Sequence, residues 1–221
     1  MFTSINLICG CLGIIEVFEG RLANVAYYIW IAGLVDFLDG YSARLMDSSS
    51  LIGKDLDSLA DLVSFGVLPS LLSYALLREF STIPYLPYLA ILIAVFSALR
   101  LAKFNNDERQ SDTFYGLPTP ANALFFSSLP LLLEQGSYVH ILQNEYIFSV
   151  IIIIFSVLLV SEIKLMAFKF KKFQWAGNQV KILFILFGLM AIIFFQVIAI
   201  PYIIVMYILI SLITNFMPGK I

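Results

Sequence analysis

The chain has 221 residues, of which 61% are hydrophobic and only 13% are charged, and its formal net charge is −2. A mean hydropathy of +0.94 excludes an ordinary water-soluble domain, because most of the surface of such a domain would then be apolar. We therefore expect the lipid bilayer to be the solvent of this protein.

Apolar runs of helix-spanning length follow one another along the chain, since a membrane span needs about 20 largely apolar residues. We predict eight spans, at residues 4–19, 22–39, 56–77, 84–104, 118–134, 145–163, 181–197 and 199–216. The first run lacks a basic leading segment and an evident small-residue cleavage site, so we interpret it as a retained helix and not as a signal peptide. The expected fold is an all-α polytopic membrane bundle that forms one domain.

The basic residues predict the orientation of this bundle. With the N-terminus in the cytoplasm, eleven of the thirteen Lys and Arg residues fall on the cytoplasmic side, and only Arg21 and Arg78 fall outside. Such a bias follows the positive-inside rule. We therefore expect both termini, and the polar loops at 40–55, 103–117 and 164–180, to lie at the cytoplasmic face of the cytoplasmic membrane.

An acidic segment at residues 36–61, DFLDGYSARLMDSSSLIGKDLDSLAD, contains six aspartates. Asp36 and Asp39 are three residues apart, and Asp57 and Asp61 are four apart, so each pair projects from one face of its helix. If the two helices are neighbours, four carboxylates converge near the membrane interface. Their mutual repulsion requires neutralising cations, which makes a divalent metal site the natural hypothesis.

Carboxylate ligands favour a hard cation, Mg²⁺ or Mn²⁺, over zinc, and two ions can share four such ligands. Magnesium usually binds partly through substrate phosphates, so the segment predicts a phosphate-bearing ligand. Gly40 and Gly53 permit a close backbone approach to that ligand, and Arg44 offers a planar fork for phosphate oxygens. We interpret Asp47 and Asp55 as solvated loop residues.

The segment fits the pattern D-x2-D-G-x2-A-R-x8-G-x3-D-x3-D at every fixed position. The matching residues are Asp36, Asp39, Gly40, Ala43, Arg44, Gly53, Asp57 and Asp61. This pattern resembles the signature of the CDP-alcohol phosphotransferases, membrane enzymes with six core helices in which an alcohol displaces CMP from a CDP-linked donor. The resemblance implies a core over about residues 3–180 and two additional helices over about 181–216.

The resemblance also implies roles for individual residues. One metal ion would be held by Asp36, Asp39 and Asp57, and the other by Asp36, Asp57 and Asp61. Asp61 would in addition be the general base that takes the proton of the acceptor hydroxyl. The residues in contact with the CDP-lipid would be Thr3, Asp39, Gly40, Ala43, Arg44, Ser50 and Gly53.

Four further segments resemble the phosphatidylserine synthase branch of that family: TSINLICGCLGI at 3–14, ALRLAKFN at 98–105, FYGLPTPANA at 114–123 and LVSEIKLMAFK at 159–169. The resemblance implies CDP-diacylglycerol as donor and L-serine as acceptor, with phosphatidylserine and CMP as products. The serine-binding candidates are Arg100, Lys103, Asn105, Gly116 and Pro118. Lys103 departs from the branch, where many relatives carry arginine, and a lysine grips a carboxylate less well.

Three alternatives stay open at this point. In the first alternative, the donor is an archaeal ether lipid. In the second, the acceptor is a different alcohol, such as glycerol 3-phosphate or inositol. From another class, the chain is a cation transporter that uses intramembrane aspartates. Besides the substrates and membrane lipids, we expect a second copy of the chain as partner, in a homodimer, and no nucleic acid.

Overall fold

The described chain is almost entirely helical, in agreement with the all-α prediction. The computed structural model describes residues 2–46, 51–106, 114–136, 139–165 and 179–216. Its helices are α1 (Phe2–Phe18), α2 (Leu22–Met46), α3 (Leu51–Asp61), η1 (Leu62–Val67), α4 (Leu68–Phe80), η2 (Leu86–Ala90), α5 (Ile91–Asn106), α6 (Thr119–Glu134), α7 (Val139–Leu142), α8 (Glu145–Val160), α9 (Gln179–Phe195), η4 (Gln196–Ile198) and α10 (Ala199–Phe216). The strands β1 (Phe114–Tyr115) and β2 (Lys164–Leu165) form one short antiparallel pair.

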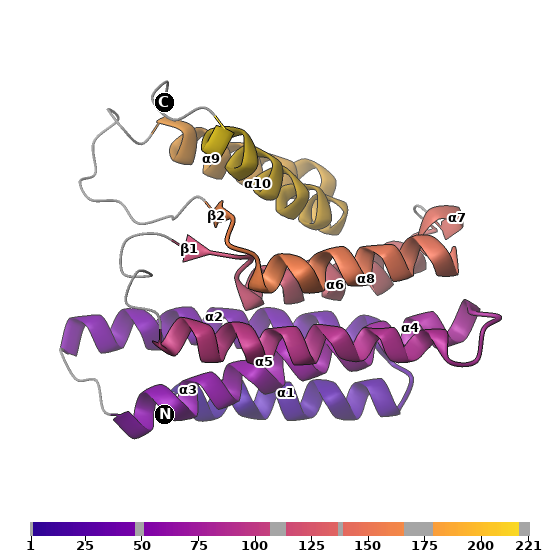
Figure 1. The fold of residues 1–221 in the computed structure, drawn as a ribbon, viewed down its shortest axis with the longest axis horizontal. Helices are drawn as coiled ribbons and strands as arrows, with labels where there is room; N and C mark the ends of the chain where they lie inside the picture. Colours follow the sequence, from indigo (N-terminus) through magenta and orange to yellow (C-terminus); the bar gives the residue numbers. More distant parts are fainter. Residues whose placement is uncertain (1, 47–50, 107–113, 137–138, 166–178, 217–221) are drawn as a thin grey trace.

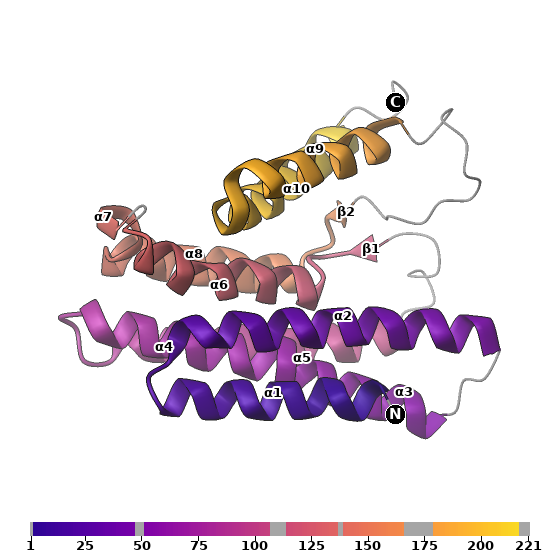
Figure 2. The ribbon, with the colours of Figure 1, turned by 180° about the vertical axis from the view of Figure 1, so that it is seen from behind.

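The long helices are stacked in layers with their axes roughly aligned. α1 to α5 lie lengthwise beside one another, α6 and α8 cover them, and α9 and α10 lie outermost (Figure 1). The reverse view shows the same order (Figure 2). Contacts between α2 and α6, between α5 and α8, and between α6 and α10 join the layers.

Among the described residues, four helical stretches are long and apolar enough to cross a membrane: Leu22–Ser42, Ile52–Phe80, Leu86–Asn106 and Ile182–Ile213. Two other apolar helices, Phe2–Phe18 and Glu145–Val160, are shorter. The last of the four long stretches includes η4, where α9 ends and α10 begins, and these two helices pack against each other. A membrane protein is thereby supported, while the count of eight spans stays a prediction.

Helices α3, η1 and α4 follow one another without a break, and the π-helical segment η1 begins at the residue after Asp61. A π-helical turn inside an α-helix is often found at a functional site. Helix α1 crosses this point closely, because a Cβ added at Gly10 would lie only 2.5 Å from the Oγ of Ser64. The glycine therefore lets α1 pack against the helix that carries the second aspartate pair.

The end of the bundle remote from the aspartates is joined by polar contacts. The Glu145 carboxylate at the start of α8 accepts hydrogen bonds from Ser81 Oγ at 2.7 Å and from the backbone N–H and the Oγ1 of Thr82, at 2.7 and 2.8 Å. The Asn144 side chain caps the same helix by accepting from the N–H groups of Tyr146 and Ile147. The turn after α4 is thus fixed to α8.

The segment GLPTP, residues 116–120, is bonded through its backbone to a distant part of the chain. Gly116 N–H donates to Ile163 O at 3.0 Å, and Leu117 N–H donates to Leu158 O at 2.9 Å, so the chain entering α6 is bonded to the chain leaving α8. Gly116 has φ +75°, and a Cβ there would lie 2.4 Å from the carbonyl oxygen of Leu159. Only glycine fits this position without displacing backbone.

We expect Gly116→Ala to lower the free energy of unfolding by about 2–4 kcal/mol, since a left-handed backbone and a clash with a carbonyl both oppose the methyl group. Gly136→Ala is the matched control, because Gly136 has φ +68° but nothing within 4 Å of the added Cβ. Its cost should stay near 1 kcal/mol. Thermal unfolding in detergent measures both, and equal losses would contradict the clash at Gly116.

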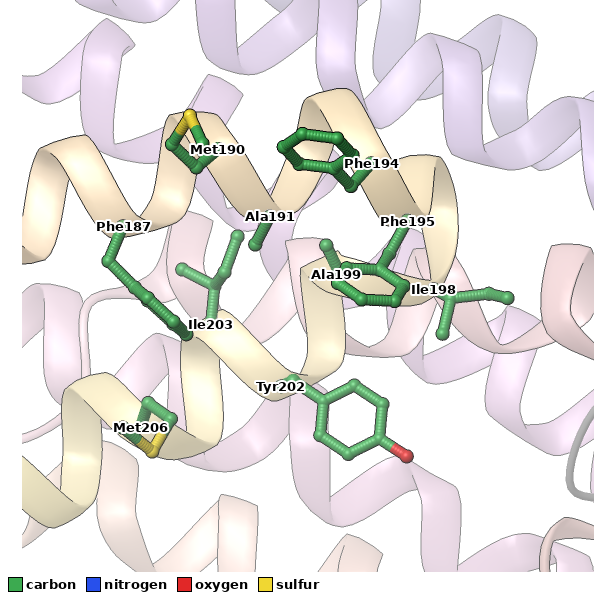
Figure 3. A pocket seen from close by; sticks show the side chains of 10 residues that line it. All are labelled: Phe187, Met190, Ala191, Phe194, Phe195, Ile198, Ala199, Tyr202, Ile203 and Met206. Atoms are coloured by element: carbon green, nitrogen blue, oxygen red, sulfur yellow. The ribbon is translucent and has the colours of Figure 1, made fainter.

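An apolar pocket of about 540 Å³ lies between α9, η4 and α10. Figure 3 shows Phe187, Met190, Phe194, Phe195, Tyr202 and Met206 among the side chains around it. The positions 199, 202, 203 and 206 that line it recur at helical spacing, so they define one face of α10.

Candidate active site

Three of the four paired aspartates converge where α2 and α3 approach each other. Asp36 comes from α2 and Asp57 and Asp61 from α3, and one carboxylate oxygen of each lies within 4.8 Å of the others. All three residues are half-buried. Helix α1 packs against both α2 and α3 and thereby holds the two helices together.

Asp39 is not a member of this close group. Its carboxylate accepts a short hydrogen bond from Thr3 Oγ1, which joins α2 to the first turn of α1. It remains within electrostatic range of Asp36 and Asp57. The structure therefore brings the predicted fourth ligand and the predicted lipid contact Thr3 together at the edge of the cluster.

Asn6 of α1 holds Asp61 in place. Its Nδ2 donates to Asp61 Oδ1 at 2.9 Å, and its side chain is fully buried. The backbone oxygen of Asn6 in turn accepts from Ser64 Oγ at 2.9 Å. One oxygen of the Asp61 carboxylate is thus engaged by a neutral donor, and its orientation is fixed from α1 and η1.

Arg100 of α5 lies beside the cluster. It is 7% exposed, and its guanidinium interacts electrostatically with the Asp61 carboxylate. The Cζ atom lies 5.8 Å from the ring centre of Phe104, and Nε has no hydrogen-bond partner among the described residues. A buried cation with an unsatisfied donor is costly by itself, so this group suits an anionic ligand.

The other serine-binding candidates lie in contacts of their own. Lys103 Nζ forms an ion pair with Glu162 Oε1 at 3.3 Å. Asn105 Nδ2 donates to Ser58 Oγ at 2.7 Å, and its backbone oxygen accepts from Lys54 Nζ at 3.0 Å. These contacts join α5 to α3 and to the end of α8.

Gly116 lies in the backbone contact described above, and Pro118 directly precedes α6 as its N-cap. Among the described residues, Arg100 is thus the serine candidate that interacts with the aspartates.

The predicted CDP-lipid contacts are described only in part. Gly40 near the end of α2 and Gly53 near the start of α3 are exposed, on the two sides of the link between these helices. Ala43 and Arg44 belong to the last turns of α2, but their side chains are outside the described part of the structure, and Ser50 is outside the described residues altogether.

The donor set of the cluster fits a hard divalent cation. Three carboxylates supply only oxygen atoms, which is the ligand type of Mg²⁺ and Mn²⁺. Their separation of at most 4.8 Å lets them face a common point. Half-buried like charges at this distance repel, and a bound cation removes that repulsion.

Sequence reasoning missed the residues that orient the cluster. Asn6 and Ser64 are polar residues inside apolar runs, and that feature alone is the signal that was available for them. Ser58 and Glu162, which engage Asn105 and Lys103, carry no such signal because both lie in polar stretches.

The apolar helices and the acidic cluster suit a membrane enzyme that uses a divalent cation. The family model for CDP-alcohol phosphatidyltransferase matches residues 1–161, and the chain belongs to this family. Membership of a transferase family removes the cation-transporter alternative. The matched region ends at the end of α8, so α9 and α10 lie outside it.

Several curated relatives are named for one reaction. The chain is 36% identical over 143 residues to CDP-diacylglycerol–serine O-phosphatidyltransferase of Bacillus subtilis. This alignment covers 62% of this chain and 80% of the relative. The chain is 33% identical over 180 residues to the Helicobacter pylori protein of the same name, and this alignment covers 79% of the chain and 73% of the relative. The archaetidylserine synthase of Methanothermobacter thermautotrophicus is 34% identical to the chain over 166 residues, and this alignment covers 74% of the chain and 67% of the relative.

Proposed function

We propose that this protein transfers a phosphatidyl group from CDP-diacylglycerol to the hydroxyl of L-serine, giving phosphatidylserine and CMP. The observation that carries the proposal is the convergence of Asp36, Asp57 and Asp61 beside a buried arginine, in a chain whose relatives are named for this reaction. The similarity to an archaetidylserine synthase favours an ether-linked donor as the second candidate.

In the proposed reaction, Asp61 is the general base for the acceptor hydroxyl. Its carboxylate takes the proton of the serine hydroxyl while the hydroxyl oxygen bonds to the phosphorus that carries diacylglycerol. The bond from that phosphorus to the bridging oxygen breaks, and CMP leaves with that oxygen. Asn6 keeps Asp61 oriented throughout, because it donates to Oδ1 and leaves Oδ2 for the proton.

A divalent metal would complete the site, and two ions, Mg²⁺ or Mn²⁺, are proposed. Asp36, Asp39 and Asp57 would hold one, and Asp36, Asp57 and Asp61 the other. Bound metal neutralises charge on the diphosphate and on departing CMP. The lipid-linked nucleotide would contact Thr3, Asp39, Gly40, Ala43, Arg44, Ser50 and Gly53.

The acceptor would be held chiefly by Arg100, since a guanidinium binds a carboxylate through two parallel hydrogen bonds. Lys103, Asn105, Gly116 and Pro118 remain proposed parts of the wall around it. Lys103 and Asn105 would act through the contacts that join α5 to the segment after α8 and to α3. Gly116 and Pro118 would act through the backbone that leads into α6.

We further propose that the chain is a single domain that crosses the cytoplasmic membrane eight times. Six helices would form the core and two would follow it, with both termini and the active site at the cytoplasmic face. The basic residues support this orientation through the positive-inside rule. A homodimer is the proposed assembly.

An acceptor panel tests the function. Purified protein is given CDP-diacylglycerol, Mg²⁺ or Mn²⁺, and either serine, inositol or glycerol 3-phosphate, and CMP release is measured. We expect serine to support release at least about a hundredfold better than the other two, as for a site built to pair a specific polar group. CMP release with inositol or glycerol 3-phosphate and none with serine would contradict the proposal. The ether-linked donor, assayed with serine, separates the two donor candidates.

A further inference from the structure

The end of α5 is held against α3 by a closed ring of three hydrogen bonds, the α3–α5 clamp. Asn105 Nδ2 donates to Ser58 Oγ at 2.7 Å, and Ser58 Oγ donates to the backbone oxygen of Lys54 at 3.1 Å. Lys54 Nζ donates in turn to the backbone oxygen of Asn105 at 3.0 Å. Asn105 thus engages two residues that lie about one turn apart on the same face of α3.

The clamp residues and the aspartates occupy neighbouring columns of α3. One column consists of Lys54 and Ser58, and the other consists of Asp57 and Asp61. At about 100° per residue, the two columns lie about 60° apart around the helix axis. A rotation of α3 that turned the aspartates away from Asp36 would therefore also break the α3–α5 clamp.

The aspartate cluster itself supplies a force that the α3–α5 clamp opposes. Carboxylate oxygens of Asp36, Asp57 and Asp61 lie within 4.8 Å of one another, and like charges at this distance repel. Residues 52–56 of α3 are exposed, so apolar burial does little to hold this end of the helix against that repulsion. The hydrogen bonds to Asn105 are thus placed where burial does not fix the helix.

The same continuous helix is held farther along by packing. The segment η1 contacts both α5 and α1, and Asn6 of α1 donates to Asp61 Oδ1 at 2.9 Å. Helix α5 therefore meets this helix at two levels, through η1 beyond Asp61 and through the α3–α5 clamp beside Asp57. Contacts at two levels fix both the tilt and the rotation of the helix that carries these aspartates.

We propose that Asn105 is a positioning residue for the metal ligands, because the α3–α5 clamp holds α3 in the rotation that directs its aspartates toward Asp36. The inference rests on the proposed function, in which these carboxylates bind a divalent metal. Groups that orient metal ligands from outside the coordination shell typically contribute about 10- to 100-fold in metal affinity or activity. Asn105 therefore acts on the reaction through α3 and the metal.

The test measures metal binding in the absence of substrate. For purified protein in detergent, the rise in unfolding temperature above its value in EDTA is followed as Mg²⁺ is added. We expect Asn105→Ala to raise the Mg²⁺ concentration that gives half of the maximal rise by about tenfold. CMP release with serine should recover toward the wild-type rate as Mg²⁺ is raised, and the KM for serine at saturating Mg²⁺ should be unchanged.

Asn106→Ala is the matched control for Asn105→Ala. Asn106 is the next residue at the same end of α5, and its Nδ2 donates within that helix, to the backbone oxygen of Ala102 at 2.8 Å. The control removes the same amide without taking a contact from α3. Its half-maximal Mg²⁺ concentration should stay within about twofold of the wild-type value.

A double variant tests whether Asn105 acts through Ser58. Ser58→Ala should raise the half-maximal Mg²⁺ concentration about as much as Asn105→Ala does. The two substitutions together should raise it little more than either one alone, since both remove the same hydrogen bond. Independent, multiplying effects would contradict the α3–α5 clamp.

Other outcomes would overturn the positioning role of Asn105. One is a half-maximal Mg²⁺ concentration in Asn105→Ala within about twofold of the wild type, and another is an equal shift in Asn106→Ala. A raised KM for serine with an unchanged metal response would make Asn105 an acceptor contact instead. A wild type without metal-dependent stabilisation would leave no ligands to position.

Failure of the proposed function gives a different result. If the wild type releases CMP with another alcohol and not with serine, the proposed acceptor is wrong. The metal measurement, which is made without substrate, still decides the role of Asn105 in that case.

Discussion

Asp61→Asn is expected to lower CMP release in the presence of serine about a thousandfold. General-base catalysis typically contributes factors of 10²–10⁴, and an asparagine can neither take the hydroxyl proton nor supply the anionic oxygen. The substitution keeps the size of the side chain, and an amide oxygen can still accept from Asn6. Initial rates of CMP release measure the effect, with thermal unfolding and gel filtration in detergent as the check on folding.

Asp55→Asn is the control for Asp61→Asn. Asp55 lies on the same helix, α3, but is exposed, and it is absent from the close group of carboxylates. Its removal takes away the same charge without touching the site, so turnover should stay within about twofold of the wild type. Unchanged turnover in Asp61→Asn would remove that residue from the base role, and an equal loss in both variants would indicate a general charge effect.

The central part of the site could be predicted because its physics is local. Aspartates three or four residues apart share a helix face whatever the rest of the chain does. A short link in the sequence places α2 beside the continuous helix α3–η1–α4, and Asp36, Asp57 and Asp61 lie close together. The helical state of the apolar runs was equally predictable, since a long apolar run in a bilayer must satisfy its backbone internally.

Contacts between distant segments could not be predicted in this way. Asn6 reaches Asp61 across 55 residues of chain, and that pairing depends on how closely α1 approaches η1 at Gly10. Lys103 is a serine-binding candidate through its place in a segment, and its pairing with Glu162, 59 residues away, has no local signal in the sequence. A basic residue near a membrane interface has many acidic groups in reach, and the sequence does not rank them.

The packing of α9 and α10 could not be predicted from the sequence either. Their sequences are apolar almost throughout, so hydrophobic periodicity does not say which face is buried. Packing against α6 and α9 decides it, and this packing buries Tyr207. The buried face of α10 is therefore known only once the layers are known.

Removal of divalent metal is expected to abolish CMP release, and addition of Mg²⁺ or Mn²⁺ to restore it. Without a cation, Asp36, Asp57 and Asp61 leave three carboxylates within 4.8 Å of one another, so their repulsion opposes the folded arrangement. Metal should thus stabilise the protein even without substrate. A concentration 100 times the dissociation constant adds about 2.7 kcal/mol, which thermal unfolding with and without EDTA detects.

Asp36→Asn tests whether the stabilisation arises at this cluster, because Asp36 is the α2 member of the group and would contact both proposed ions. The variant should lose most of the metal-dependent increase in unfolding temperature together with the activity. Asp55→Asn should keep both. An Asp36→Asn protein that gains as much stability from metal as the wild type would place the cation elsewhere, because a ligand stabilises the fold only through the site it occupies. Full activity of the wild type in EDTA would instead show that the aspartates act without metal, leaving Asp61 as base and Arg100 as a positive charge that interacts with it.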